Sequence, residues 1–173
     1  MATRRRSPAP ERDATPAEMR ALANPLRLRI LRLCLDEELT NQELASKLDR
    51  DPGTVLFHVR RLVSAGFLAA RPERPGPRGR TERPYRATGK SWSIRMMPDP
   101  SHTAATLEAV RQEIAEAGDG ALLTNVRLGV RLTKRDTEEL RRRLRALGDE
   151  FAERDNPRGT PIGLLAVVHR RGG

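Results

Sequence analysis

The strongest constraint on the fold is a series of closely spaced helix start and stop signals in the first half of the chain. Thr15-Pro16 is typical of a helix N-terminus, and Pro25 interrupts that helix at Asn24 because proline has no backbone N–H to donate. A second helix follows the break, and its apolar face is expected to comprise Leu26, Ile30, Leu31, Cys34 and Leu35. The chain is therefore divided here into short helices that must pack on one another.

Two further helices are predicted on either side of a tight turn. Thr40 and Glu43 have the spacing of a capping box, so a short helix is expected to begin there. Asp51-Pro52 starts the next helix, over about residues 52–64, and Gly66 ends it. Its inward face is expected to comprise Val55, Val59, Leu62 and Val63. Two short helices joined in this way are typical of a helix-turn-helix motif.

A hairpin with a cationic tip is predicted directly after these helices. Residues 67–70 are expected to form one strand, residues 75–80 a tip rich in proline and glycine, and residues 81–88 the returning strand. Helices followed by such a hairpin are the arrangement of a winged helix-turn-helix domain. We expect this domain over residues 16–97, preceded by a disordered basic tail at residues 1–15.

The C-terminal region, residues 101–173, is predicted to have the order α-β-α-β and to serve dimerisation or effector binding. Apolar periodicity indicates helices at residues 101–117 and about 136–154, while alternating apolar residues indicate strands at 125–132 and 162–169. The predicted fold class is thus α+β. Whether the two strands pair within one chain or across a dimer is left open.

Positive charge is concentrated on the predicted winged domain. The chain has 33 Lys+Arg against 23 Asp+Glu, a net charge of +10. Residues 50–95 hold eleven basic and three acidic side chains, so this window carries +8 and the rest of the chain only +2. A local cationic patch favours an anionic partner, and beside a helix-turn-helix motif that partner is expected to be double-stranded DNA.

Several other classes of protein are disfavoured. The longest apolar stretches are far shorter than the ~20 residues of a membrane span, and the N-terminus lacks the apolar core of a signal peptide, so we expect a cytoplasmic protein without membrane contact. The single cysteine, Cys34, excludes an intramolecular disulfide framework and a metal site built on clustered cysteines. No catalytic triad, metal-ligand spacing or phosphate-binding loop stands out, so we expect no catalytic residue, no metal and no cofactor.

The candidate DNA contacts lie on the two helices of the motif and on the wing. Small or polar side chains at a helix N-terminus allow base edges to approach closely, while arginines reach backbone phosphates. The predicted contacts are Thr40, Asn41, Gln42, Gly53, Thr54, Leu56, Phe57, His58, Arg60, Arg61, Arg74, Arg78, Arg80 and Arg83. Two alternatives stay open: Leu56 contacts a thymine methyl or simply packs, and His58 contacts DNA or is packed or solvated.

Several segments resemble the ArsR type of bacterial winged-helix repressors. The similar segments are residues 21–31, 39–48, 53–62, 65–68 and 80–88. The resemblance spans about residues 16–92 and implies a homodimeric transcriptional regulator, a repressor, that binds a palindromic operator. The metal sensors of this family commonly carry paired cysteines where this chain has Glu43-Leu44-Ala45-Ser46, so metal sensing is not implied.

An apolar stripe follows the wing directly, on the helix predicted at residues 101–117. We expect it to form the dimerisation surface through Leu107, Val110 and Ile114, with packing inside its own domain as the alternative. Two alternative functions remain. The protein is an enzyme with a catalytic C-terminal half that is recruited to nucleic acid, or its winged helix binds another protein. The sequence does not identify the operator, a small-molecule effector or the direction of regulation.

Overall fold

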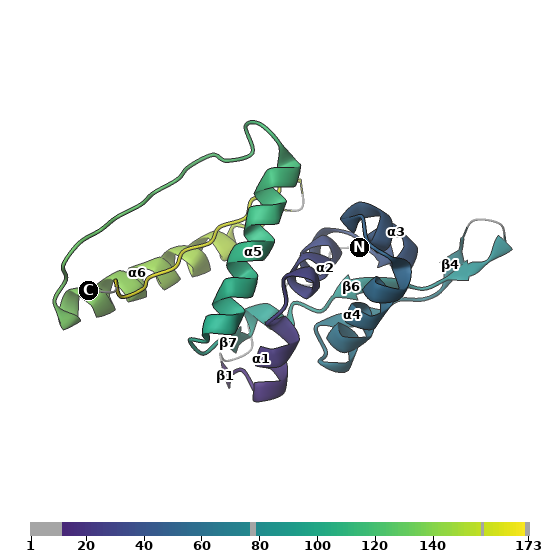
Figure 1. Ribbon diagram of the computed structural model, residues 1–173, viewed down its shortest axis with the longest axis horizontal. Helices are drawn as coiled ribbons and strands as arrows, with labels where there is room; N and C mark the ends of the chain where they lie inside the picture. The colour runs from purple at the N-terminus through teal and green to yellow at the C-terminus, as the bar shows by residue number, and fades with distance from the viewer. Residues whose placement is uncertain (1–11, 77–78, 157, 172–173) are drawn as a thin grey trace. The chain divides into compact units, whose positions relative to one another are not determined.

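The computed structural model describes residues 12–76, 79–156 and 158–171 (Figure 1). The chain divides into two compact units, Met1–Ala121 and Leu122–Gly173, which we describe separately. The first unit contains the winged helix-turn-helix domain and the helix that follows it, and its described part is a mixture of helices and short strands.

The helix break predicted at Pro25 is confirmed. Helix α1 spans Pro16–Leu22, and helix α2 spans Pro25–Asp36. The side chain of Thr15 accepts a hydrogen bond from Glu18 N–H at the start of α1, and the side chain of Asn24 accepts one from Arg27 N–H at the start of α2. Each helix thus begins with a proline in its first turn and a polar side chain that satisfies a free N–H group.

Helices α3 (Asn41–Leu48) and α4 (Pro52–Ser64) form the helix-turn-helix. The capping box between Thr40 and Glu43 is present in both directions, as predicted. The turn between the helices contains Asp49, the one non-glycine residue with positive φ in the described chain (49°). Asp51 then caps α4, since its carboxylate accepts a hydrogen bond from Thr54 N–H at 2.8 Å.

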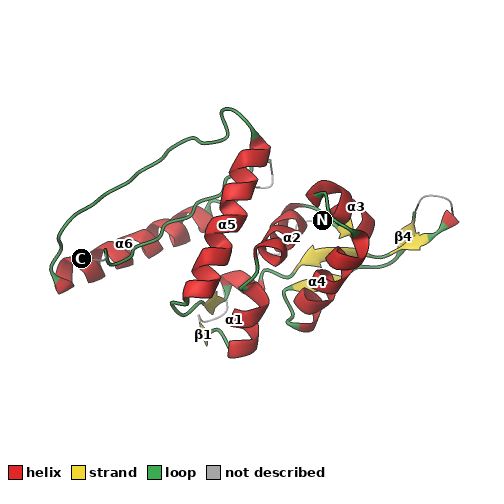
Figure 2. Cartoon of the chain, viewed as in Figure 1, coloured by secondary structure: helices red, strands yellow, loops and turns green. Residues whose placement is uncertain are grey.

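The wing is an antiparallel sheet with a narrow extension. Strands β2 (Leu39–Thr40), β6 (Pro84–Ala87) and β3 (Leu68–Ala70) lie in the order β2-β6-β3. Beyond them, β4 (Arg74–Pro75) pairs with β5 (Thr81–Glu82). Figures 1 and 2 show β4 extending away from the helices. The hairpin prediction is confirmed, whereas β2 was not predicted.

A second small strand pair corrects the prediction for the N-terminus. Strand β1 (Arg12–Asp13) pairs in parallel with β7 (Ile94–Arg95), which follows a short 3₁₀ helix at Lys90–Trp92. The expected disordered tail of residues 1–15 therefore does not fit residues 12–15, and residues 1–11 lie outside the described part of the chain. The partner strand is 82 positions away, so local composition could not indicate it.

The core of the first unit lies between the helices and the β2-β6-β3 sheet. Fully buried side chains include Ile30, Cys34, Leu44, Val55, Val59, Leu62 and Phe67. The inward face predicted for α4 is correct at three of four positions, whereas Val63 is 37% exposed and is not part of the core. This core fixes the orientation of α4 relative to α2 and α3.

Helix α5 (Pro100–Ala117) completes the first unit by packing against α2. The residues that it buries are small, Ala105 and Ala109. Arg29 of α2 is buried and donates hydrogen bonds to Gln112 and Glu116 of α5. Small residues at the contact let the two helices approach closely, and this arginine connects them.

The described part of the second unit, residues 122–156 and 158–171, contains one helix, α6 (Lys134–Glu153), between two segments without strand structure. The strands predicted at 125–132 and 162–169 are therefore wrong, although both helices of the predicted α-β-α-β order are present. Apolar residues on both segments are exposed, for example Val126 (81%) and Leu164 (71%). Alternation predicts extended backbone, but a strand also needs a partner for its N–H and C=O groups, and sequence alone does not supply one.

Candidate nucleic-acid interface

The outward face of α4 carries most of the predicted contacts of that helix. Gly53 and Thr54 are exposed in its first turn, and Arg60 and Arg61 are exposed further along. A Cβ atom at Gly53 would lie 3.0 Å from Asp51 Oδ2, so glycine leaves room for the carboxylate that caps the helix. The N-terminal end of α4 is therefore small, capped and open to an approaching surface.

An aromatic and cationic cluster lies in the middle of α4. The rings of Phe57 and His58 meet edge to face, with centroids 5.2 Å apart, and the Arg61 guanidinium lies 5.2 Å from the Phe57 centroid. Phe57 is 53% exposed, whereas Leu56 and His58 are half-buried. Among the predicted DNA contacts on α4, only Leu56 and His58 are partly covered by the protein.

Arg27 of α2 belongs to this cluster, and the sequence prediction did not include it. Its Nη1 atom lies 3.4 Å from Nδ1 of His58, 31 positions further along the chain. Burial is the larger cause and the charge of Arg61 the smaller cause of a lowered Arg27 pKa. Burial and then the charge of Arg27 lower the pKa of His58 below its ordinary value of 6.5. Cations thus gather beside α4 without a carboxylate paired to Arg27 among the described residues.

The three candidates at the start of α3 differ in their exposure. Thr40 is only 2% exposed, and its hydroxyl accepts the capping hydrogen bond from Glu43 N–H, so the structure does not support it as a DNA contact. Asn41 is half-buried and donates from Nδ2 to the carbonyl of Pro52 at 2.9 Å, which links the starts of α3 and α4. Gln42 is exposed. A capping residue at a strand end is buried by the sheet, which the capping pattern alone does not show.

The wing arginines are partly neutralised by nearby carboxylates. Arg74 forms an ion pair with Glu43 at 2.7 Å, and Arg83 forms one with Glu73 at 2.5 Å. Arg80 is exposed and forms no ion pair with a residue that the structure describes. Arg78 lies outside the described residues. The positive charge of residues 50–95 is therefore not all available to a ligand, because Arg74 and Arg83 already have anionic partners.

We also looked among the described residues for a reactive thiol, a metal site and a membrane-spanning helix. Burial raises the pKa of Cys34 to about 12, so its thiol stays protonated and unreactive at neutral pH. Within residues 12–76, 79–156 and 158–171, no three His, Cys, Asp or Glu side chains gather where a metal ion could bind. None of the helices described is long and apolar enough for a membrane span.

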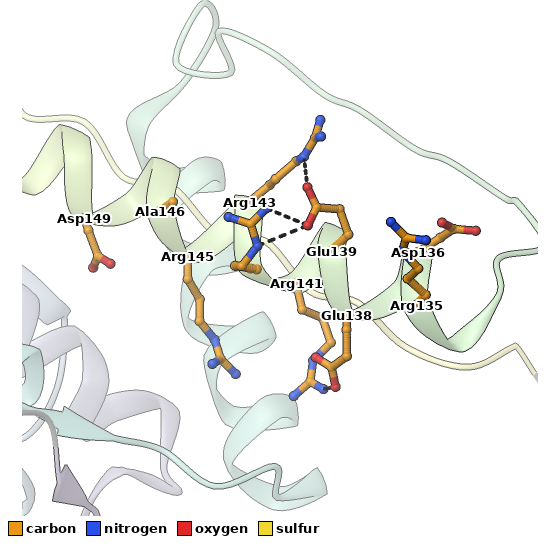
Figure 3. Close-up of a pocket in the computed structure, with 10 residues that line it drawn as sticks. Arg135, Asp136, Glu138, Glu139, Arg141, Arg143, Arg145, Ala146 and Asp149 are labelled. Atoms are coloured by element: carbon orange, nitrogen blue, oxygen red, sulfur yellow. Dashed lines mark hydrogen bonds and ion pairs between the residues drawn. The ribbon is translucent and has the colours of Figure 1, made fainter.

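The depression shown in Figure 3 lies along α6. All the residues lining it come from that helix, and two of its carboxylates, Glu138 and Glu139, are paired with arginines three or four positions away. Glu139, for example, accepts hydrogen bonds from both Arg142 and Arg143 at 2.6 Å. Ion pairs of this spacing are ordinary on a solvated helix, so the depression indicates no ligand.

Comparison with known proteins identifies the central part of the first unit. Residues 22–71 match a protein family described as a helix-turn-helix domain. Among solved structures, the chain is similar to reduced HlyU from Vibrio cholerae, with 24% identity over 53% of this chain and 80% of that one and a TM-score of 0.36. It is also similar to an apo double mutant of ZitR from Lactococcus lactis, with 20% identity over 75% and 83% of the two chains and a TM-score of 0.36.

No curated protein matches the chain. The identification rests on the family match and on the elements themselves, since residues 22–71 span α2, α3, α4 and β3, in the order that the motif requires. Residues 22–71 are a helix-turn-helix domain, and the hairpin that follows makes it a winged one.

Proposed function

We propose that this protein is a cytoplasmic transcriptional regulator that binds double-stranded DNA as a homodimer and represses transcription from a palindromic operator. The observation that carries the proposal is the exposed outer face of α4, which lies in a winged helix-turn-helix domain and combines small residues at its start with arginines further along. A helix of this kind fits the major groove with its N-terminal residues at the base edges.

The proposed docking assigns different tasks to different parts of α4. Gly53 and Thr54 lie closest to the bases, because their small side chains let base edges approach the start of the helix. Arg60 and Arg61 are exposed and form no ion pair with a described residue, so they are free to contact backbone phosphates. Phosphate contacts position the domain, and base contacts select the sequence.

The wing is proposed to follow the DNA backbone beside the groove. Arg80 is available directly, whereas Arg74 and Arg83 must exchange their carboxylate partners for phosphate oxygens. Such an exchange is favourable only where the DNA supplies negative charge at close range, so these two arginines respond to docking rather than drive it. Arg78 is proposed as a further wing contact from its position in the sequence.

Dimerisation is proposed to use the outer face of α5. Leu107 and Ile114 are 49% and 41% exposed on this helix, and Val110 between them is half-buried. The helix buries Ala105 and Ala109 and leaves Leu107 and Ile114 exposed. No described residue of the second unit is buried, although its apolar side chains are numerous, and a partner chain would remove them from water as well.

Selection of bound sequences from random duplexes, followed by footprinting on the selected site, tests the proposal. Because a two-fold dimer presents two α4 helices to one side of the DNA, we expect two inverted half-sites about 10 bp apart or a multiple of that. Absence of any protected palindrome at low salt would contradict the operator proposal.

A further inference from the structure

Arg27 is held in place by the break between α1 and α2. Its Nε donates to the carbonyl of Ala21 at 2.5 Å, and its Nη2 donates to the carbonyl of Arg20 at 2.8 Å. The residue four positions after Ala21 is Pro25, which has no N–H, so the usual helical partner of that carbonyl is missing. The guanidinium of Arg27 supplies the missing donor, and this fixes its orientation.

The fixed guanidinium determines which nitrogen of His58 carries the proton. Its third nitrogen, Nη1, lies 3.4 Å from His58 Nδ1. A guanidinium has only donors, so Nδ1 must act as the acceptor, and a neutral imidazole then carries its hydrogen on Nε2. Burial and the charge of Arg27 lower the pKa of His58, which keeps the ring neutral at pH 7.

The hydrogen on Nε2 is directed away from Arg27, because the two nitrogens of an imidazole point to different sides of the ring. His58 is half-buried rather than enclosed, and no described residue accepts a hydrogen bond from its Nε2. The ring is also held against Phe57 on the exposed side of α4. The arrangement leaves one oriented donor without an acceptor among the residues that the structure describes.

We propose that His58 is a specificity-determining residue that donates from Nε2–H to an acceptor on a base edge, and that Arg27 is the positioning residue that sets this tautomer. The inference rests on the proposed binding of DNA through α4. Acceptors in the major groove are N7 and O6 of guanine, N7 of adenine and O4 of thymine, whereas cytosine presents a donor there. A fixed donor therefore disfavours cytosine at one position of each half-site.

The first test needs no DNA. In the intact protein labelled with nitrogen-15 histidine, long-range proton–nitrogen spectra report the tautomer of each ring, and a His58→Phe variant identifies the His58 signals. We expect the Nε2–H tautomer in the wild type. In Arg27→Met, removal of the charge should raise the His58 pKa towards its ordinary value and mix the tautomers. Arg20→Met removes an exposed arginine side chain of α1 but keeps the carbonyl that Arg27 contacts, so it should change neither. An Nδ1–H tautomer in the wild type overturns the proposal, even if Arg27→Met fails to fold.

The second test measures base preference. Binding sites are selected from random duplexes with the wild type, His58→Phe, Arg27→Met and Arg20→Met. We expect His58→Phe and Arg27→Met to lose the wild-type base preference at the same position of the half-site. Both should also bind the wild-type site about tenfold more weakly, whereas Arg20→Met keeps the base preference. An unchanged preference in His58→Phe overturns the inference while leaving the DNA-binding proposal intact. Failure of the wild type to bind any duplex contradicts the proposed function instead, whatever the tautomer is.

Modified duplexes separate a base acceptor from a phosphate. A 7-deazapurine at the selected position removes N7 and leaves the backbone unchanged, while a methylphosphonate removes the charge of one phosphate. If N7 is the acceptor, wild type and His58→Phe should bind the 7-deaza site with equal affinity. If the acceptor is O6 of guanine or O4 of thymine, a base modified at that oxygen should make their affinities equal instead. If only the methylphosphonate removes the difference between the two proteins, His58 contacts the backbone and the proposed base contact is wrong.

Discussion

At the residue scale, one buried carboxylate connects parts of the first unit that are distant in sequence. Glu18 is 5% exposed and pairs with Arg12 at 2.7 Å and with Lys90 at 2.8 Å. It also accepts a hydrogen bond from Thr15 N–H at 2.8 Å. Lys90 in turn donates to the carbonyl of Ala65, at the end of α4. One side chain thus links the N-terminal strand, the start of α1 and the end of the proposed recognition helix.

Replacing this carboxylate should lower stability in a pH-dependent way. The hydrogen bond from Arg12 is the main cause that holds the Glu18 pKa far below its ordinary value of 4.5. We expect Glu18→Gln to cost about 2 kcal/mol at pH 7, because two cations lose their partner. A lowered pKa contributes stability above the unfolded pKa and loses it as pH falls, so the difference from wild type should shrink progressively below about pH 5.

Urea unfolding of both proteins between pH 7 and pH 3 measures this difference. Glu37→Gln is the control, since Glu37 forms an exposed ion pair with Lys47 at 3.5 Å that contributes about 0–1 kcal/mol. A Glu18→Gln protein as stable as Glu37→Gln at pH 7 would contradict the role given to the buried carboxylate.

At the element scale, α4 needs a defined end so that its outer face keeps its direction. Gly66 closes the helix with φ of 75°, a conformation that residues with a Cβ adopt only at a cost. A Cβ atom there would also lie 3.2 Å from Nζ of Lys90, which donates to the Ala65 carbonyl at 2.5 Å. The glycine and the lysine together close the helix and join it to α1 through Glu18.

Gly66→Ala is therefore expected to lower the free energy of unfolding by about 1–2 kcal/mol. Gly148→Ala is the matched control, because Gly148 is exposed within α6 and nothing lies within 4 Å of an added Cβ atom. Alanine favours the helix there, so this variant should retain or increase helicity. Thermal unfolding followed by far-ultraviolet circular dichroism compares the two. Equal effects in both variants would show that the backbone conformation at Gly66 is not what matters.

The wing gives a second prediction at this scale. Arg80→Ala should weaken binding to all duplexes by a similar factor, because phosphate contacts carry no sequence information. The slope of log affinity against log salt should fall by about one contact, roughly 0.9. Arg111→Ala, which removes an arginine paired with Glu108 on α5, should leave the slope unchanged. Fluorescence anisotropy across a salt series measures both, and an unchanged slope in Arg80→Ala would remove this residue from the interface.

At the scale of the whole molecule, the uncovered apolar surface is the main feature to explain. Leu107 and Ile114 are exposed on α5, and Leu147 and Phe151 are exposed on α6. A single chain thus leaves large apolar side chains in water on both of its units. Association with a second copy would bury them and would also present two α4 helices to a palindrome.

A charge placed on the α5 stripe should therefore prevent association. Leu107→Glu combined with Ile114→Glu is expected to give a monomer with unchanged helicity and much weaker binding to a two-half-site duplex. Ser101→Glu changes the charge of the same helix at an exposed position of its first turn, away from the face of Leu107 and Ile114, and should remain dimeric. Sedimentation equilibrium and circular dichroism measure both properties. A wild-type protein that sediments as a monomer at high concentration would contradict the proposed dimer.

Local features of the sequence were sufficient for the helical part of the fold. Thr15, Asn24, Thr40 and Asp51 cap helices through atoms within three residues of themselves, so their effect is visible in the order of the amino acids. Pro25 separates α1 from α2 for an equally local reason. The winged helix-turn-helix could therefore be predicted, and with it the exposed face of α4.

The tertiary structure decided every feature that depends on a distant partner. The two C-terminal segments alternate like strands but pair with no other segment among the described residues, and Arg74 pairs with Glu43 across 31 positions. The contact between Arg27 and His58 also spans 31 positions. Capping and helix periodicity are properties of neighbouring residues, so the sequence by itself determined them. Strand pairing, the neutralisation of arginines and the protonation of a histidine depend on which atoms the fold brings together, and only the tertiary structure could determine those.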